Sequence, residues 1–117
     1  GKCHMGPDHP QIEIYKESKH GILFEANRNN NMNLKSEKWV PGKDYSAAPT
    51  CASCHMGATP NQPVTHEVGA RISWTLRPVI SVKQENWEKK RESMKNVCAQ
   101  CHSKGFFENS ILNLILQ

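Results

Sequence analysis

The sequence predicts a mainly α protein of short helices and irregular loops, and three observations lead to that fold class. Two patterns, Cys-x-x-Cys-His at 51–55 and again at 98–102, space their reactive side chains as one helical turn does. Only 37% of the 117 residues are hydrophobic, which is thin for a self-sufficient core. Five prolines between positions 41 and 78 keep the middle irregular, and no segment predicts a strand of useful length. We therefore expect short helices wrapped around something other than an ordinary apolar core.

The spacing within each pattern matches covalent attachment of haem. Cys51, Cys54 and His55 stand at i, i+3 and i+4, so all three share one helix face. Two sulfurs there can bond the porphyrin vinyl groups while the imidazole ligates the iron. The pattern at 98–102 repeats this arrangement. The sequence thus predicts c-type haem, attached through the four cysteines, with one histidine of each pattern as proximal ligand: Cys51, Cys54, His55, Cys98, Cys101 and His102.

A third pattern is present in part. The chain opens Gly1-Lys2-Cys3-His4, which reads as the end of the same signature and explains the odd total of five cysteines. We expect residues 1–117 to be a single internal fragment of a multihaem cytochrome c domain with three attachment motifs, the first truncated. Cys3 and His4 would hold the haem of that first motif.

Zinc and disulfides are the alternatives to haem. Two Cys-x-x-Cys pairs can form a tetrahedral thiolate site, but zinc does not require a histidine directly after each pair. The gap from Cys54 to Cys98 also exceeds the usual span within a zinc ribbon. A disulfide framework would strand Cys3 and leave the histidines unexplained. Haem accounts for all of these residues.

The charge balance argues against nucleic acid as a partner. Fifteen Lys and Arg against eleven Asp and Glu give a net charge of +4. Haem propionates account for this excess, because a ferric porphyrin with two ionised propionates carries about one net negative charge. No run of basic residues with interleaved aromatics is present. We therefore expect no nucleic-acid binding.

Two helices are predicted. The first starts at Pro10, capped by Asp8 or His9, and runs to His20, where Gly21 ends it. The second covers about 84–103, with an apolar stripe and a solvated face of charged residues at 88–92. Residues 27–33 predict a surface loop, and the apolar stretch 110–116 is too short to cross a bilayer.

The remaining histidines are candidate ligands on the distal side of the irons. Electron-transfer haems take a second axial ligand, and His20 and His66 are the natural candidates; the alternative for each is an ordinary surface or capping histidine. Asp8 and His9 also have two interpretations. The pair either caps the helix at Pro10 or accepts protons from a small substrate at neutral pH.

With these motifs in place, the chain resembles the octahaem hydroxylamine oxidoreductase family, which includes the hydrazine-oxidising enzymes of anaerobic ammonium oxidisers. The resemblance extends to about His102 and is carried by Gly6-Pro7-Asp8-His9-Pro10-Gln11, Glu17-Ser18-Lys19-His20-Gly21, Cys51-Ala52-Ser53-Cys54-His55-Met56-Gly57, Thr65-His66-Glu67-Val68-Gly69 and Arg71-Ile72-Ser73-Trp74. It implies a largely helical subunit with about eight haems in the full-length protein, assembled as a homotrimer. One of those haems is catalytic and is cross-linked to a tyrosine of a neighbouring subunit.

Carried over by position, the resemblance implies three electron-transfer haems in this fragment, with His20 and His66 as distal ligands. Asp8 and His9 match the acid–base pair that faces the catalytic iron. The motif of that catalytic haem and the cross-linking tyrosine are expected upstream and downstream of these residues. After His102 the match weakens.

The resemblance implies an enzyme that oxidises hydroxylamine or hydrazine, small nitrogenous substrates, and passes electrons to a soluble cytochrome c. The sequence does not separate the two substrates. The alternatives are a multihaem cytochrome that only relays electrons and a reductive enzyme acting on nitrite. Covalent haem of this type is attached outside the cytoplasm, so we expect an extracytoplasmic protein, in the periplasm or in the lumen of the anammoxosome.

Overall fold

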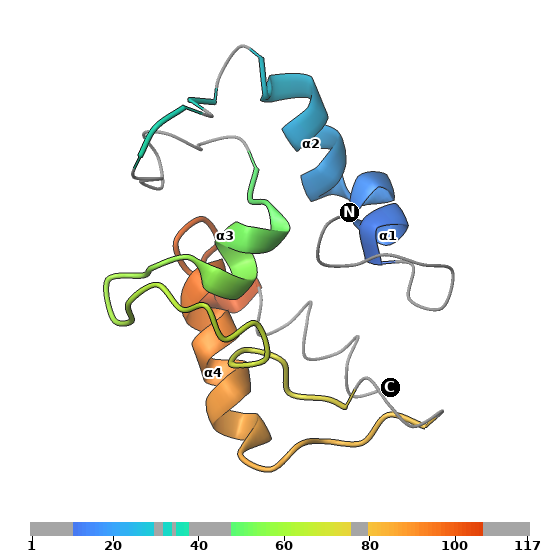
Figure 1. The fold of residues 1–117 in the computed structure, drawn as a ribbon, viewed down its shortest axis with the longest axis vertical. Coiled ribbons are helices and arrows are strands. Elements are labelled where there is room, and N and C mark those ends of the chain that lie inside the picture. The colour runs from blue at the N-terminus through green and yellow to red at the C-terminus, as the bar shows by residue number, and fades with distance from the viewer. Residues whose placement is uncertain (1–10, 30–31, 34, 38–47, 76–79, 107–117) are drawn as a thin grey trace. The chain divides into compact units, whose positions relative to one another are not determined.

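The computed structural model describes residues 11–29, 32–33, 35–37, 48–75 and 80–106, where it contains four α-helices and no β-strand (Figure 1). The chain divides into two compact units, residues 1–50 and 51–117. Isolated bridges join Thr59 to Gln62 and Trp74 to Lys83. The helices are α1 (Gln11–Glu17), α2 (Lys19–Asn27), α3 (Cys51–Met56) and α4 (Trp87–Cys98). The predicted mainly α fold class is confirmed. None of the described helices has the length and apolar character needed to span a membrane.

Ser18 makes the break between α1 and α2. Its extended backbone (φ −73°, ψ 159°) interrupts the helix. Its hydroxyl donates to the carbonyl oxygen of Tyr15 at 2.6 Å and accepts from the N–H of Gly21 at 3.1 Å. A serine N-cap of this kind stabilises a helix by about 1 kcal/mol. The prediction of one helix ending at Gly21 is therefore wrong: α1 ends before Ser18, and His20 lies in the first turn of α2.

Gly21 is needed for close packing rather than for helix termination. It is the buried residue of α2. A Cβ at this position would overlap the carbonyl oxygen of Tyr15 and would lie 2.9 Å from the Cα of Lys16. Because these are backbone atoms, no side chain can move aside to make room. Glycine thus allows α2 to begin directly against the end of α1.

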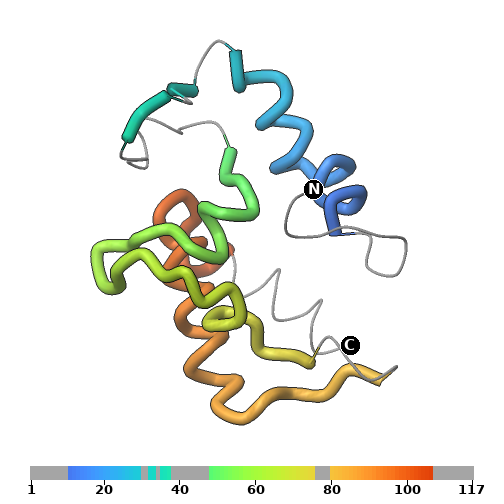
Figure 2. Tube along the Cα trace, in the orientation of Figure 1, coloured from blue at the N-terminus to red at the C-terminus, as the bar shows by residue number. Residues whose placement is uncertain are grey.

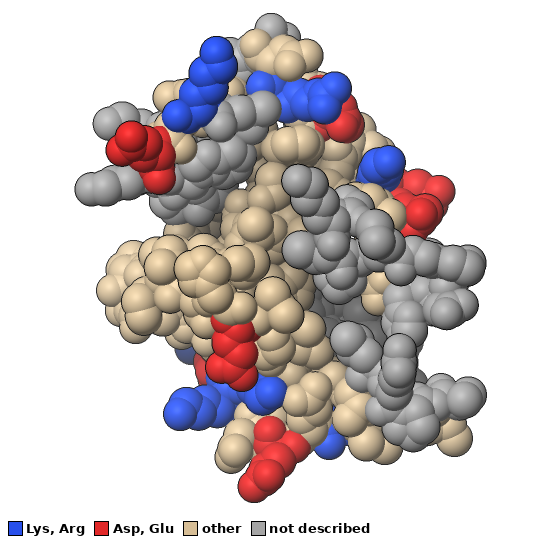
Figure 3. Space-filling view, in the orientation of Figure 1, with Lys and Arg blue, Asp and Glu red and all other residues tan. Residues whose placement is uncertain are grey.

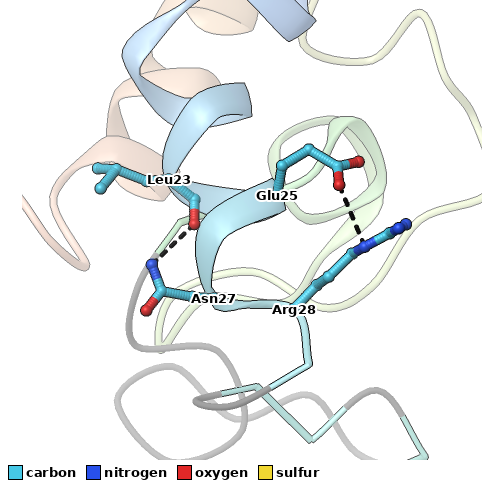
Figure 4. A network of polar contacts seen from close by, with 4 residues as sticks. All are labelled: Leu23, Glu25, Asn27 and Arg28. Atoms are coloured by element: carbon cyan, nitrogen blue, oxygen red, sulfur yellow. Dashed lines mark hydrogen bonds and ion pairs between the residues drawn. The ribbon is translucent and has the colours of Figure 1, made fainter.

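The C-terminal end of α2 is held by local contacts (Figure 4). The side-chain amide of Asn27 donates to the carbonyl oxygen of Leu23 at 2.8 Å. Arg28 forms an ion pair with Glu25, with 3.1 Å between its Nε and Oε2. Both charged side chains are about half-exposed, so this pair contributes less than about 1 kcal/mol. Asn27, predicted to open a loop, is instead the last residue of α2.

In the second unit, a long irregular segment leads from α3 to α4 and packs onto α4 (Figure 2). Two hydrogen bonds join Gln62 to Ser93 of α4: the Gln62 amide donates to the Ser93 carbonyl at 2.8 Å, and the Ser93 hydroxyl donates to Oε1 of Gln62 at 2.6 Å. Lys90 Nζ donates to the Gly69 carbonyl at 3.2 Å and to Oε1 of Gln84 at 2.8 Å. The predicted solvated face of α4 is therefore partly occupied by these contacts. Helices α3 and α4 also lie in direct contact.

Helix α4 is shorter at both ends than the predicted 84–103. Asn86, directly before it, adopts a left-handed conformation (φ 58°, ψ 31°), which cannot continue into a helix. At the other end Cys98 is the last helical residue, and the chain tightens into turns in which Cys101 N–H donates to the Cys98 carbonyl at 3.1 Å. Cys101, which falls within the predicted helix 84–103, therefore lies in this turn.

The described residues bury little apolar surface. The buried hydrophobic side chains are Met32, Ala48 and Val97, and no large side chain in the described ranges is fully buried. Large apolar side chains remain exposed in both units: Ile14, Ile22, Leu23, Val64, Val68, Ile80, Val82 and Phe106. Within the described residues there is thus no self-sufficient core, which agrees with the expectation that a large apolar cofactor completes the fold.

Candidate haem-attachment site

The first complete motif forms α3. Its six residues begin at Cys51 and place Cys54 and His55 on the same helical face, as the spacing predicts. Cys51 is exposed, whereas Cys54 and His55 are half-buried. Gly57 follows directly, and its N–H donates to the carbonyl oxygen of Ser53 at 3.3 Å. A Cβ on Gly57 would lie 2.6 Å from that oxygen, so a glycine is required where the chain leaves the motif.

Arg71 fixes the C-terminal end of α3. It is 4% exposed, and its two terminal nitrogens donate to the carbonyl oxygens of Cys54 and Gly57 at 2.8 and 2.7 Å. The last carbonyls of a helix lack partners within the helix, and a cation there also suits the helix dipole. Burial lowers the pKa of Arg71, although the nearby Cys54 thiol acts in the opposite direction. The guanidinium thus holds the motif in place from a position seventeen residues beyond Cys54.

Replacing Arg71 by methionine is expected to loosen the first motif. Two buried carbonyls would lose a charge-assisted partner, at a cost of about 2 kcal/mol, and hydrogen-exchange protection of the Gly57 amide should fall roughly thirtyfold. Exchange measured by mass spectrometry on peptides covering 51–57 reports this directly. Arg28→Met, which removes an exposed arginine, is the matched control and should leave these peptides unchanged. Equal protection in Arg71→Met and wild type would contradict the capping role.

The second complete motif begins in α4 and ends in the turn after it. Cys98 is half-buried at the end of the helix, and Cys101 is exposed. The N–H of His102 donates to the Cys98 carbonyl at 2.9 Å, so the motif keeps the rise of one helical turn although α4 has ended. The His102 ring stacks on Phe106, with centroids 4.4 Å apart and 10° between the planes. This stacking fixes the orientation of the imidazole that is predicted to ligate iron.

The fold brings the two motifs together. Gln100, inside the second motif, donates from its side-chain amide to the Ala58 carbonyl just after the first, at 3.4 Å. The hydrogen bonds between Gln62, which follows the first motif, and Ser93, which precedes the second motif in α4, join the same two parts of the chain. The two motifs are therefore neighbours in the fold, although Cys54 and Cys98 are more than forty residues apart in sequence.

The donor set fits covalently bound haem. In the described ranges the four cysteines are free thiols, so they form no disulfide framework. Within the same ranges no three His, Cys, Asp or Glu side chains converge as ligands of a single metal ion. Each motif keeps two thiols and a histidine within one turn, as thioether attachment requires. When bound, haem supplies a redox-active iron to this site.

Burial keeps the inner thiols protonated. Burial first, and then the neighbouring thiols of Cys98, Cys51 and Cys101, raise the pKa of Cys54 to about 11, while Arg71 acts in the opposite direction. Burial also raises the pKa of Cys98. Thiols in this state are poor metal ligands and slow to oxidise, because the thiolate is the reactive form.

The pKa of Cys54 predicts slow alkylation in the polypeptide before haem attachment. A pKa of about 11 rather than 9.0 leaves roughly one hundredfold less thiolate at pH 7, so iodoacetamide should react with folded Cys54 about that much more slowly than in urea. Because the folded pKa lies above the unfolded one, the resulting stabilisation is present below pH 9 and is lost as pH rises towards 11. Peptide mapping at several pH values tests this, and equal rates with and without urea would refute it.

The other predicted site residues are spread over the chain. His66 is exposed in the loop after α3, where the Glu67 N–H donates to the Thr65 hydroxyl at 3.1 Å. His20 is exposed on α2 and belongs to the first unit. Neither position tests the prediction of distal ligation. Cys3, His4, Asp8 and His9 lie outside the described residues.

Sequence reasoning missed the residues that hold the two motifs in place. In the sequence Arg71 stands out only as part of a segment that carries the family resemblance, and no pattern marks Gln62 or Ser93. A single arginine with no motif around it gives no sign that it will cap a helix seventeen residues earlier. The Gln62–Ser93 pair is equally hidden, because its partners are 31 residues apart in sequence.

Two adjacent Cys-x-x-Cys-His turns with free thiols, in a helical chain that buries few of its own apolar side chains, define a c-type cytochrome with more than one covalent haem. The whole chain, residues 1–117, matches the model of a family described as "Seven times multi-haem cytochrome CxxCH", and the chain belongs to that family. It therefore binds c-type haem covalently and serves redox electron transfer, as predicted.

A named relative is similar over most of this chain. The chain is 31% identical to a probable nitrite reductase-hydroxylamine oxidoreductase fusion protein of Kuenenia stuttgartiensis, over 130 aligned positions that cover 89% of this chain. The match covers 15% of that relative, so the chain spans a small part of its length. No solved structure matches the chain significantly.

Proposed function

We propose that this chain is part of a multihaem oxidoreductase that oxidises hydroxylamine or hydrazine at a haem iron and passes the electrons through its c-type haems to a cytochrome acceptor. The observation that carries the proposal is the joining of the two complete motifs by the Gln100–Ala58 and Gln62–Ser93 hydrogen bonds. Neighbouring attachment sites of this kind suit a relay of electrons between haems. The name of the Kuenenia relative supports the choice of a nitrogen-oxidising reaction.

In this proposal the chain's residues hold three relay haems. Cys51, Cys54 and His55 hold one, Cys98, Cys101 and His102 hold the next, and Cys3 and His4 hold the third. His20 and His66 supply distal ligands, so that an iron they ligate changes charge with little change in its surroundings. The full-length protein carries about eight haems, and the catalytic one is attached outside these residues.

Asp8 and His9 act as proton acceptors in this proposal. Oxidation of hydroxylamine to nitric oxide releases three electrons and three protons, and oxidation of hydrazine to dinitrogen releases four of each. The electrons leave through the haems, but the protons need a base within hydrogen-bond reach of the substrate nitrogen. A carboxylate next to an imidazole provides two acceptors that work at neutral pH.

The partners and the compartment follow from the same proposal. The acceptor is a soluble cytochrome c, the full-length enzyme is a homotrimer, and it works outside the cytoplasm, in the periplasm or the anammoxosome lumen. The net charge of +4 is offset by haem propionates and implies no nucleic-acid partner.

A reductive enzyme acting on nitrite is the second candidate, because the name of the Kuenenia relative includes nitrite reductase as well as hydroxylamine oxidoreductase. A relay cytochrome with no substrate site is the remaining alternative. In the relay every iron is six-coordinate, and the protein does not react with hydroxylamine or hydrazine.

The deciding experiment uses the full-length, haem-matured parent protein. Cytochrome c reduction is followed with hydroxylamine and with hydrazine, and nitrogen-15 products are identified by mass spectrometry. Nitric oxide, nitrite or dinitrogen released together with cytochrome reduction is the expected result and names the substrate. If neither compound reduces a protein with its full haem complement, the oxidative proposal fails, and nitrite with a reductant then separates the reductive enzyme from the relay.

A further inference from the structure

Trp87, the first residue of α4, carries two cations against its ring. The Nζ of Lys83 lies 4.0 Å from the indole centroid, and the guanidinium carbon of Arg91 lies 4.8 Å from it. Lys83 also lies 6.0 Å from the Trp74 ring. Each contact is favourable by itself, but the two cations repel one another. Within the described residues neither of them forms an ion pair with a carboxylate, so the two positive charges are held together without a counter-charge.

Arg91 also has an unused hydrogen-bond donor. Its Nη2 is buried and finds no acceptor in the described part of the chain. Burying a charged donor without an acceptor is unfavourable, because the group loses its hydrogen bonds to water and gains none within the protein. Acidic and basic side chains lie near one another on the face shown in the space-filling view (Figure 3), yet none of the described acidic residues forms an ion pair with Arg91. The residue therefore indicates an anionic partner that belongs to the mature protein.

The position of Arg91 on α4 indicates which partner that is. Arg91 precedes Cys98 by seven residues, which places both on the same helix face with about 10 Å between them along the axis. A haem attached through its vinyl groups carries its two carboxylates on the opposite edge of the ring. A guanidinium can donate two parallel hydrogen bonds to one carboxylate, so arginine binds a carboxylate in a more defined geometry than lysine does.

We propose that Arg91 binds a propionate carboxylate of the haem attached at Cys98 and Cys101, with Lys83 as the second cation of the same site and Trp87 as the surface that orients both. This inference depends on covalent haem, which the family shows, and not on the substrate proposed above. The site takes a carboxylate as its ligand. Its function is to fix the far edge of the haem and to raise the reduction potential of that haem, because a nearby positive charge favours the ferrous state.

Arg91→Gln in the full-length, haem-matured protein tests the proposal. Loss of the guanidinium should shift the redox equilibrium of one haem about tenfold towards the ferric form, which for a one-electron couple lowers its midpoint potential by 59 mV. Spectroelectrochemical titration measures this shift. Resonance Raman spectra should show a shift in the propionate bending band of the same haem. Lys89→Gln removes an exposed cation two residues away on α4 and is the matched control, for which neither quantity should change.

Arg91→Lys separates charge from geometry and also covers the case in which Arg91→Gln does not mature. It keeps the positive charge, so the potential should stay within the wild-type range while the propionate band shifts. If Arg91→Gln lowers the midpoint potential but leaves the propionate bands unaltered, the carboxylate that binds Arg91 comes from an acidic side chain and not from haem. That result would overturn the proposal. Unaltered propionate bands in Arg91→Lys would overturn it as well.

Discussion

Replacing Cys51 and Cys54 together by serine should remove one covalent haem from the full-length protein and leave the other haems attached. Serine keeps the size of each side chain but cannot form a thioether with a vinyl group. The two thiols act as a pair on one face of α3, so no other side chain of that motif can substitute for them. Haem content per polypeptide, from the pyridine haemochrome spectrum and from intact mass after denaturation, measures the loss.

Ser53→Ala is the matched control, because it alters the same helix without touching a sulfur. A haem count equal to that of wild type in the Cys51/Cys54 double variant would exclude the motif as an attachment site. A second readout comes from the neighbouring haem. Because Gln100 and Gln62 join the two motifs, loss of the first haem should also shift the midpoint potential of the haem at Cys98 and Cys101.

The chemistry of this chain was predictable from sequence because it depends on spacing within a single turn. The pattern at 51–55 became α3 with its two cysteines and histidine placed as expected. The pattern at 98–102 kept the same rise even though α4 ends at Cys98, since the His102 N–H still reaches the Cys98 carbonyl. Local geometry of this kind does not depend on distant parts of the fold.

Helix boundaries were less predictable, because packing between elements decides them. Glycine is a common helix stop, and Gly21 was predicted to be one. Its actual role follows from the Tyr15 carbonyl, which leaves no room for a Cβ when α2 starts directly after Ser18. Asn86 likewise shortens α4 through a left-handed backbone that residue preferences permit but do not require.

The residues that place the two motifs side by side were beyond sequence reasoning. Arg71 reaches back seventeen positions to the Cys54 carbonyl, and Gln62 reaches forward to Ser93. Neither contact follows from periodicity or from a motif. The small apolar core was also hard to predict, because part of it is supplied by the cofactor. The chain leaves Val64, Val68 and Val82 exposed, and the haem that should cover such surfaces is recognised in the sequence only through its attachment motifs.

Replacing Asp8 by asparagine and His9 by glutamine should lower turnover of hydroxylamine or hydrazine by roughly a hundredfold to ten-thousandfold, the usual contribution of a general base. Both changes keep the size and hydrogen-bonding character of the side chain but remove a proton acceptor. The residues lie outside the described ranges, and the prediction follows from the proposed function. The measurement is steady-state cytochrome c reduction by the full-length enzyme, with kcat and KM determined separately.

A proton-accepting role and a helix-capping role predict different results in this variant. If the pair accepts protons during oxidation, kcat falls while haem content and the midpoint potentials stay at wild-type values, because the electron path is untouched. If the pair only caps the helix that begins near Pro10, kcat changes little, because asparagine caps a helix about as well as aspartate. Hydrogen exchange in the Gln11–Glu17 peptide serves as the internal control for α1: loss of turnover with α1 protection unchanged supports catalysis, and unchanged turnover refutes it.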